Sequence, residues 1–491
     1  MRNTKRFIQT SVASALILTA LAPAHAETLR NALVKAYRTN PDLNSARADQ
    51  RANDENVPLA LAQGRPTSEL SGTYTEELRR TISPFPGAGF STPKRNITTQ
   101  ATANVPIYQG GVVRNSILAA KSSVQAGQEN LRGTEASLFS AVVSAYMDVI
   151  RDSAVVSLNQ QNVHALSVNL QASSDRFEVG DLTRTDVAQS DSRLALARAS
   201  LQSAEADLIA SKERYVSLVG DAPGDLEVPP PLPGMPVTPD AAVEVALKDN
   251  PNILAAQHQR EAAHHNSDSA AGQIMPRVSA FVQGSYLDYL GSEKDLNENF
   301  RPQGSNKAAA AGVQLTLPLY QGGRPGALTR QARARESSAL EQEIAAERSV
   351  IAQARSAYAR WQASLLTIES TKTAVSSGEL SLEGVQAENS AGTRTILDIL
   401  DSQRDLLNAQ VQYVTAQRDA YVAGFSLLAA MGHAEARDLG LDGGPLYDPN
   451  VNYRQVHHKL IDFDFGSAAT HESTSTTKVP VQDAKLIKIG R

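Results

Sequence analysis

The feature of this sequence that most constrains its fold is an internal repeat. The segment Val-Pro-Ile-Tyr-Gln-Gly-Gly at 105–111 recurs as Leu-Pro-Leu-Tyr-Gln-Gly-Gly at 317–323, which is 212 positions later. The same shift aligns Gly180 with Gly392 and Asp186 with Asp398. Because a repeat of this kind marks one supersecondary unit used twice, we expect equivalent modules at 27–220 and 241–432. The linker between them, 221–240, is rich in proline.

Residues 1–26 have the pattern of a secretory signal peptide. Arg2, Lys5 and Arg6 form a basic start, 12–21 are mostly apolar, and Ala-His-Ala at 24–26 provides a small-residue cleavage site. A membrane anchor is the alternative, but the apolar stretch is too short to span a bilayer. Cleavage before Glu27 would remove three bases and no acids, which moves the formal charge from −5 to −8. That charge disfavours a nucleic-acid partner.

The sequence contains no cysteine. We therefore expect an exported chain without disulfides and without a lipid-modified N-terminal cysteine. After the signal, no segment has 18 consecutive apolar residues, so no transmembrane helix is expected.

Each module begins with two short helices divided by Asn-Pro and continues into two strands of alternating polarity. The helices are expected at 29–39, 42–63, 241–249 and 252–273, and the strands at about 66–76, 96–107, 277–287 and 308–319. A soluble sheet packed on helices would explain the alternation. A membrane β-barrel also would, because its strands alternate over about ten residues in an exported chain. The smallest bacterial barrels have eight strands, so four strands would have to share a barrel with other chains.

After each Gly-Gly pair the pattern becomes helical and predicts coiled coils at 112–219 and 324–430. Each should contain a long helix of roughly 62 residues, about 90–95 Å in length, and a shorter helix that runs back beside it. The second short helix before the strands should stack end to end on that shorter helix, so that the two together match the long one. In the second module, eight apolar residues occupy a and d positions, the core positions of a coiled-coil heptad. At the eight aligned positions of the first module, seven residues are apolar. The second-module positions are Ile351, Ala354, Tyr358, Trp361, Leu365, Ile368, Val375 and Leu382. Their first-module equivalents are Phe139, Val142, Tyr146, Val149, Ser153, Val156, Val163 and Leu170. Trp361 is thus expected to be a core residue.

No catalytic constellation accompanies these modules. Glu261 and His264 have a spacing found in bundle metal sites, but the sequence has no second copy of it, which favours a solvated helix face. Neither Gly-Gly pair is followed by a phosphate-binding lysine motif. We expect no enzyme activity, no metal and no cofactor. The polar tail, 433–491, is expected to be largely disordered.

One charged stretch begins at a glycine, at 392–401. Asp398 and Asp401 lie three residues apart, and Arg394 lies one turn before them, so all three share a helix face. Such a cluster alone is most often a solvated surface.

Together, the tandem strand–strand–long helix–turn–helix modules, the paired Pro-x-Tyr-Gln-Gly-Gly turns and the segment 392–401 resemble the TolC family of outer-membrane efflux and secretion channels. The resemblance covers about 27–432. It implies an α+β membrane protein. Three identical chains would share a twelve-stranded barrel in outer-membrane lipid, with four strands each, continued by an α-helical coiled-coil tunnel through the periplasm. It also implies a tripartite efflux pump or a type I secretion system, with a periplasmic adaptor (membrane fusion protein) and an inner-membrane transporter as partners.

The resemblance also assigns roles to residues. The gated aperture would involve Arg394, Asp398, Asp401, Thr185 and Asp186, and the adaptor would contact Val179, Gly180, Asp181, Leu182, Ala391, Gly392 and Thr393. Arg394 is expected to restrain the closed state by bonding to Asp186 of a neighbouring coil. In one departure, Asn389 occupies the position of a gating tyrosine.

Two other classes of protein share some of these features. A periplasmic adaptor is also exported and coiled, but it needs one helical hairpin and carries soluble β-domains. A structural coiled-coil protein of the envelope would lack the alternating strands.

Overall fold

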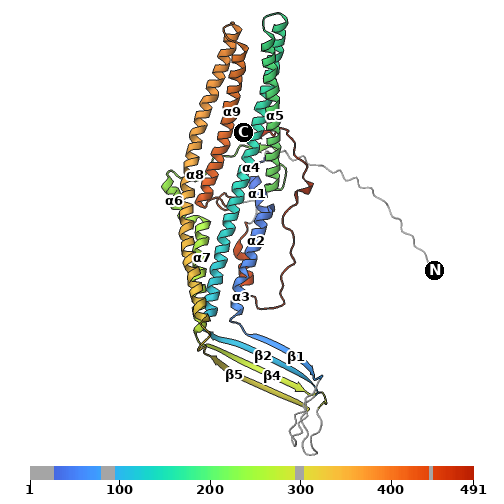
Figure 1. Cartoon of the computed structure of the whole chain (residues 1–491), viewed down its shortest axis with the longest axis vertical. Coiled ribbons are helices and arrows are strands. Elements are labelled where there is room, and N and C mark those ends of the chain that lie inside the picture. Colours follow the sequence, from blue (N-terminus) through green and yellow to red (C-terminus); the bar gives the residue numbers. More distant parts are fainter. Residues whose placement is uncertain (1–26, 79–93, 293–303, 442–445, 491) are drawn as a thin grey trace, which may run out of the picture.

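The computed structural model describes residues 27–78, 94–292, 304–441 and 446–490. The expected signal peptide lies outside these residues, as do most of the two loops that join the strands of each module. The described chain is elongated, with paired long helices at one end and a sheet at the other (Figure 1).

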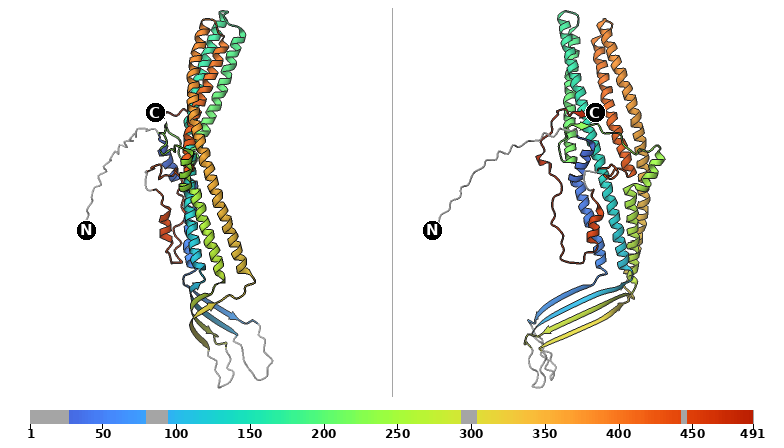
Figure 2. Two further views of the ribbon diagram at one scale, coloured as in Figure 1. Left: turned by 90° about the vertical axis from the view of Figure 1, so that its left-hand side faces the viewer. Right: turned by 180° about the vertical axis from the view of Figure 1, so that it is seen from behind.

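The two longest helices are α4 (Val112–Glu178) and α8 (Arg324–Ser390), with 67 residues each. At 1.5 Å per residue each is about 100 Å long. Their returning partners, α5 (Arg184–Val219) and α9 (Ile396–Met431), have 36 residues and cover only the end far from the sheet. Helices α2 (Pro41–Asp54), α3 (Asn56–Ala62) and α7 (Pro251–Ala271) pack along the remaining length (Figure 2). The single helix expected at 42–63 is interrupted at Glu55.

The Asn-Pro pairs explain how two short helices stack end to end beside one long helix. Helices α1 (Leu29–Thr39) and α6 (Pro239–Asp249) are followed by Asn40 and Asn250. Each asparagine caps the next helix, which begins with proline. The Asn40 amide Nδ2 donates to the Leu218 carbonyl over 3.1 Å, and that of Asn250 donates to Ala430 over 2.8 Å. Each asparagine therefore fastens the start of α2 or α7 to the end of the returning helix, α5 or α9.

The sheet contains β1 (Thr67–Glu76), β2 (Arg95–Gln109), β4 (Arg277–Asp288) and β5 (Ser305–Thr316), all antiparallel and in the order β1-β2-β4-β5. Its register places Leu70 opposite Ala101, Ala101 opposite Gly284, and Gly284 opposite Ala309. Directly opposed residues share a face, so the apolar positions of all four strands lie on one side. Among the described residues, none packs over the edge strands on that side, where Leu70 is 75% and Val313 68% exposed.

Neither edge of this sheet pairs with another strand in the described part of the chain. β1 and β5 lie at opposite edges, and two further strands separate them. Because each neighbouring pair is antiparallel, β1 and β5 run in opposite directions. The free edge of β1 in one copy can therefore pair in an antiparallel manner with the free edge of β5 in another.

The expected coil seam is buried more completely in the first module than in the second. Phe139, Val149 and Val156 are fully buried on α4, whereas Leu365 on α8 is 42% exposed. The reason is position in the row of helices. Helix α4 contacts α2, α5, α7 and α9, while α8 lies at the end of the row and contacts α6, α7 and α9. Trp361 packs edge-on against Tyr358 and is half-buried.

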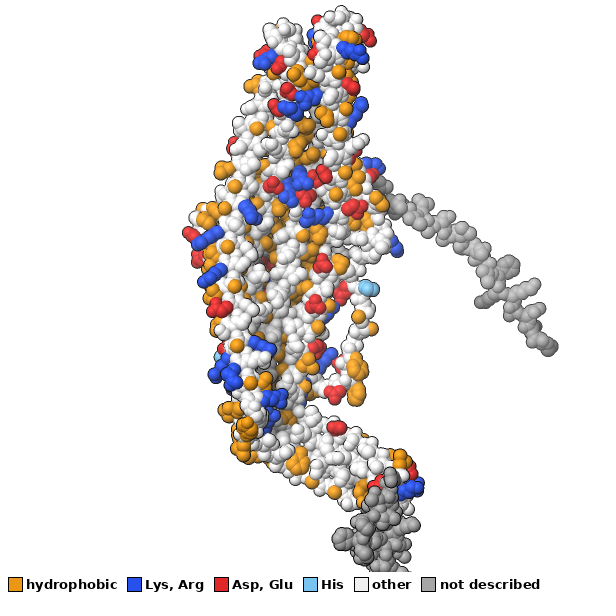
Figure 3. Space-filling view, in the orientation of Figure 1, with side chains coloured by type: hydrophobic (Ala, Val, Ile, Leu, Met, Phe, Trp, Pro, Cys, Tyr) orange, Lys and Arg blue, Asp and Glu red, His pale blue; other side chains and the backbone are white. Residues whose placement is uncertain are grey.

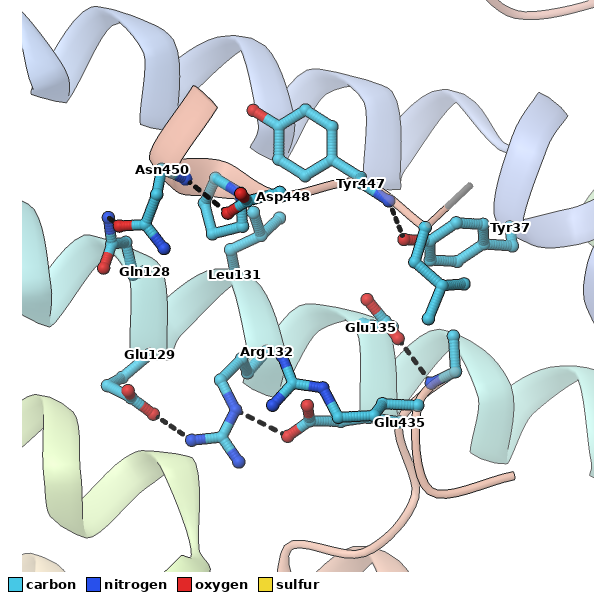
Figure 4. Close-up of a pocket in the computed structure, with 14 residues that line it drawn as sticks. Tyr37, Gln128, Glu129, Leu131, Arg132, Glu135, Glu435, Tyr447, Asp448 and Asn450 are labelled. Atoms are coloured by element: carbon cyan, nitrogen blue, oxygen red, sulfur yellow. Dashed lines mark hydrogen bonds and ion pairs between the residues drawn. The ribbon is translucent and has the colours of Figure 1, made fainter. Parts of the chain in front are cut away.

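The tail differs from the expectation of a largely disordered segment. It contains α10 (Pro449–Val456) and ends in β6 (Ile489–Gly490), which pairs in parallel with β3 (Leu226–Glu227) in the linker. Figure 4 shows how the start of the tail is attached to α1 and α4. The Arg132 Nε donates to Glu435 over 2.7 Å, the Ala436 amide to Glu135 over 2.6 Å, and the Tyr447 amide to the Tyr37 hydroxyl over 2.9 Å. Polar bonds to the first module, together with burial of Ala434, Ala436 and Leu441 in its core, hold this segment in place although it lacks hydrophobic periodicity.

Glu135 makes this attachment depend on pH. Desolvation raises its pKa, although the Ala436 amide and the nearby Arg47 and Arg132 oppose the shift. The folded protein thus binds this proton more tightly than the unfolded chain, and stability is lost as pH rises through the raised pKa.

We expect Glu135→Gln to raise the thermal midpoint at pH 8, because glutamine keeps the acceptor for the Ala436 amide without the buried charge. The corresponding gain in the free energy of unfolding should be under about 1 kcal/mol. The gain should vanish near pH 4, where the glutamate is protonated. Thermal unfolding of the detergent-solubilised protein across this pH range measures it. Glu135→Ala, which lacks the acceptor, is the control and should lower the midpoint. Equal midpoints for wild type and Glu135→Gln at pH 8 would contradict the assignment.

Candidate functional site at the helix tips

The two ends farthest from the sheet are tight turns built on glycine. Gly180 has φ +80° and Gly392 φ +79°. At the first turn the Asp181 amide donates to the Arg176 carbonyl over 2.9 Å, and at the second the Thr393 amide donates to Glu388 over 3.0 Å. This is the Schellman arrangement, in which a left-handed residue ends a helix. A Cβ would meet no atom within 4 Å at either glycine, so the requirement comes from the backbone alone.

Most of the predicted contact residues are exposed on these turns. Val179, Asp181, Ala391 and Thr393 are exposed, and Leu182 is half-buried. The Asp181 carboxylate lies 2.6 Å from the Arg176 guanidinium. The turns therefore present backbone, small and charged side chains and the apolar side chain of Val179 at the extreme end of the molecule.

Asp186 and Asp398 begin the returning helices as reciprocal caps. The Asp398 carboxylate accepts from the Thr395 amide over 2.9 Å and from its hydroxyl over 2.7 Å, while the Asp398 amide donates back to that hydroxyl. Asp186 repeats these bonds with Thr183. The threonine bonds lower the pKa of both aspartates. This capping box is a sequence pattern, Thr-x-x-Asp before a helix, that could have been recognised beforehand.

Within a single chain, the charged partners of Arg394 do not include Asp186, and the expected bond to a neighbouring coil stays a prediction. The Arg394 guanidinium lies 2.8 Å from Glu388 and 3.7 Å from Asp398, both in its own hairpin. Asn389, at the position of the family's tyrosine, donates from Nδ2 to the Arg394 carbonyl over 2.7 Å. The glycine turn brings 388–389 and 394 together, so local bonds satisfy Arg394. Thr185 is exposed on the first turn of α5.

A different ion pair joins the two coils near their tips. Arg193 on α5 lies 2.8 Å from the Asp401 carboxylate on α9. Close by, the Asn169 amide donates to Gln403 over 3.1 Å. An apolar cluster from α4, α5 and α9 lies beside these bonds and contains Leu166, Leu194, Ala197 and Leu400. Arg193 was not anticipated because the repeat aligns it with an aspartate, Asp405, and no motif contains it.

The Glu261–His264 spacing, which resembles that of bundle metal sites, is not joined by further metal ligands in the described residues. His264 Nδ1 lies 2.7 Å from the Glu336 carboxylate, which raises the histidine pKa by a hydrogen bond. Among the described residues, no group of three or more His, Asp or Glu side chains is placed to hold a metal ion. In the same part of the chain, no helix is both long and apolar enough to cross a membrane.

Comparison with known proteins places this geometry in a family. The family model described as "Outer membrane efflux protein" matches residues 32–221 and 242–433, which are the two modules. The chain belongs to the outer membrane efflux protein family. The efflux protein BepC of Brucella suis is 32% identical over 91% of this chain and 94% of its own length. TolC of Escherichia coli is 26% identical and covers 85% of this chain and 84% of its own. The CmeC outer-membrane channel of Campylobacter jejuni aligns with TM-score 0.74 at 15% identity, over 89% of this chain and 90% of that channel.

These findings confirm the resemblance to the TolC family and exclude the adaptor and the structural coiled coil. This member of the family is an outer-membrane channel protein whose helices extend into the periplasm. Its fold is that of trimeric channels, which combine a shared barrel with an α-helical tunnel. Channels of the TolC family are homotrimers that work with adaptors and inner-membrane transporters, and the family consists of ducts rather than enzymes.

Proposed function

We propose that three copies of this chain form a passive duct. A periplasmic adaptor docks onto the helix tips of the duct, and an inner-membrane transporter bound to that adaptor delivers the substrate. The observation that carries the proposal is the four-stranded sheet. In the described residues its two edge strands run in opposite directions and lack further partners, and its apolar face is exposed. Three such sheets joined edge to edge give twelve strands with no free edge, and the apolar face then lies against outer-membrane lipid.

The tips are the proposed docking surface for the adaptor. Both coils end in the same glycine turn, at 179–182 and 391–393, and a trimer would present six such turns in a ring. Their backbone conformation is fixed by Gly180 and Gly392, and their side chains leave the turn accessible. A partner that recognises the backbone conformation of these turns can therefore bind without displacing other parts of the chain.

Just inside the tips, Asp398 and Asp401 are proposed to form two stacked rings of carboxylates around the pore. Both side chains are partly exposed, at 37% and 41%. The equivalent first-module positions are Asp186 and Gln189, so the second-module helix carries more negative charge and is the one we assign to the pore. Acidic rings favour cations and repel anions.

The test of the overall function is complementation in the source organism. Deleting the gene should sensitise the cells to toxic small molecules, and the intact gene should restore resistance. We name efflux first because the 32% identical relative is described as an efflux protein. Loss of an exported protein from the medium would instead indicate type I secretion. A deletion strain with unchanged drug tolerance and unchanged secretion would contradict the proposal.

We also propose that Arg193 holds the two coils together near their tips. Arg193→Ala removes the bond from α5 to Asp401 on α9 and should raise the resting conductance of channels in planar bilayers. One partly exposed ion pair contributes roughly 0.2–1 kcal/mol, so three in a trimer could shift the open–closed equilibrium by up to about a hundredfold.

Arg394→Ser is the matched comparison for Arg193→Ala. The partners of Arg394, Glu388 and Asp398, lie in its own hairpin, so its loss should raise resting conductance much less. A larger effect for Arg394→Ser would show that it bonds to a neighbouring coil, as the family resemblance implies.

A further inference from the structure

The C-terminal tail is a strap that runs toward the sheet and back again. On the outward path, Asn452 of α10 donates to Asp54 of α2 over 2.7 Å, and Arg65 donates to the Lys459 carbonyl over 2.8 Å. On the return, Asn44 donates to the Ser473 hydroxyl over 3.0 Å. Farther on, the buried Lys212 ammonium donates to the carbonyls of 483 and 485 over 2.8 Å each. The strap is thus held by hydrogen bonds both before and after the turn at which it reverses direction near the sheet.

That turn, at 460–465, exposes four large apolar side chains. Leu460 is 73% exposed, Ile461 72%, Phe463 83% and Phe465 86%. Figure 3 shows apolar side chains gathered at the lower bend of the strap. Single exposed apolar residues are ordinary, but a contiguous group on an otherwise polar segment marks an interaction surface.

The position of the turn identifies what lies beside it. Arg65, which holds Lys459, is two residues before the first strand begins. Gly64 lies in a hollow with Tyr108 and Gly110, where the helices give way to the sheet. The turn therefore lies at the level where the chain enters the outer membrane, on the periplasmic side (Figures 1 and 2).

We propose that 460–465 is an interfacial anchor that inserts Phe463 and Phe465 into the periplasmic leaflet of the outer membrane. The occupant is phospholipid, because the turn is continuous with the membrane-embedded end of the channel and because aromatic side chains favour the membrane interface. Asp464 is paired with Lys459 at 2.9 Å, which offsets one of the two negative charges in the turn. Asp462 adds negative charge, so zwitterionic lipid suits the turn better than anionic lipid. The proposal rests on the outer-membrane location and is independent of the gating proposal.

Tryptophan fluorescence in reconstituted full-length protein tests this anchor. The only tryptophan, Trp361, is replaced by phenylalanine, and Phe463→Trp is introduced into that background. In proteoliposomes of zwitterionic phospholipid, we expect blue-shifted emission that brominated lipid quenches several-fold more strongly than it quenches a Val481→Trp control. Val481 is 90% exposed on the returning strap, far from the turn in sequence.

The possible outcomes separate lipid from other occupants. Emission typical of water-exposed tryptophan, without quenching by brominated lipid, overturns the proposal. Blue-shifted emission without quenching also overturns it and assigns the turn to a contact with a neighbouring copy. Drug efflux measured with the same Phe463→Trp variant should be unchanged, so failure of the anchor is distinguishable from failure of the channel.

Discussion

Replacing Gly180 and Gly392 together by valine should abolish efflux while the yield of trimer stays unchanged. Both glycines have φ near +80°, a conformation that costs an ordinary L-residue roughly 1–2 kcal/mol and a β-branched residue more. Since open space surrounds both positions, the substitution distorts the turns without disturbing packing elsewhere. Drug resistance of complemented cells, beside the amount of trimer in the outer membrane, measures the effect.

The matched control replaces both glycines by asparagine. Asparagine visits the left-handed region far more readily than valine, so the turns should persist and efflux should be largely retained. Normal resistance in the valine variant would contradict a docking role for the tips. Equal loss in both variants would instead show that added side-chain bulk, rather than turn conformation, blocks the partner.

The second large effect concerns ion selectivity. Asp398→Asn combined with Asp401→Asn removes six carboxylates from a trimer and should abolish most of the preference for cations and most of the block by multivalent cations. Asparagine keeps an oxygen that can accept from Thr395, so the cap of α9 should survive. Reversal potentials across planar bilayers under a salt gradient give the selectivity.

Asp405→Asn is the control for this variant. Asp405 lies one turn farther along α9, has a more exposed side chain at 69%, and pairs with Arg404. It removes charge from the same helix without touching the proposed rings, so selectivity should change little. Unchanged selectivity in the Asp398 and Asp401 variant would mean that these residues only solvate and cap a helix.

Much of the fold follows from local sequence patterns. Alternating polarity gave the strands, and the register aligned the apolar positions of all four on one face. The proline after Asn40 and the glycines at 180 and 392 marked helix boundaries because each restricts or permits particular backbone angles. The repeat transferred these assignments from one module to the other.

The rest depended on contacts between distant segments. The bond from Arg193 to Asp401 joins two different coils, and hydrophobic periodicity does not predict which residues of two coils meet. The repeat does not help either, because it aligns Arg193 with an acidic residue, Asp405. The tail lacks a hydrophobic period, so its order depends on partners such as Lys212 and Glu135, which are 271 and 301 residues away in sequence. The bond of Arg394 to Glu388 is a short-range contact, but it depends on the conformation of the glycine turn, and no residue spacing predicts it. A bond from Arg394 to a neighbouring coil stays a prediction.

The central claim is that three chains close one barrel, and disulfide trapping tests it most directly. The chain has no cysteine, so Ser71→Cys on β1 can be combined in turn with cysteine at 306, 308, 310, 312 or 314 on β5. Within one chain, β2 and β4 separate these strands by about 14 Å, too far for a disulfide, so any bond must join two chains. After oxidation in outer membranes, one combination should give covalent dimers and trimers and nothing larger. Monomers in all five combinations, or a series that continues beyond the trimer, would contradict the shared barrel.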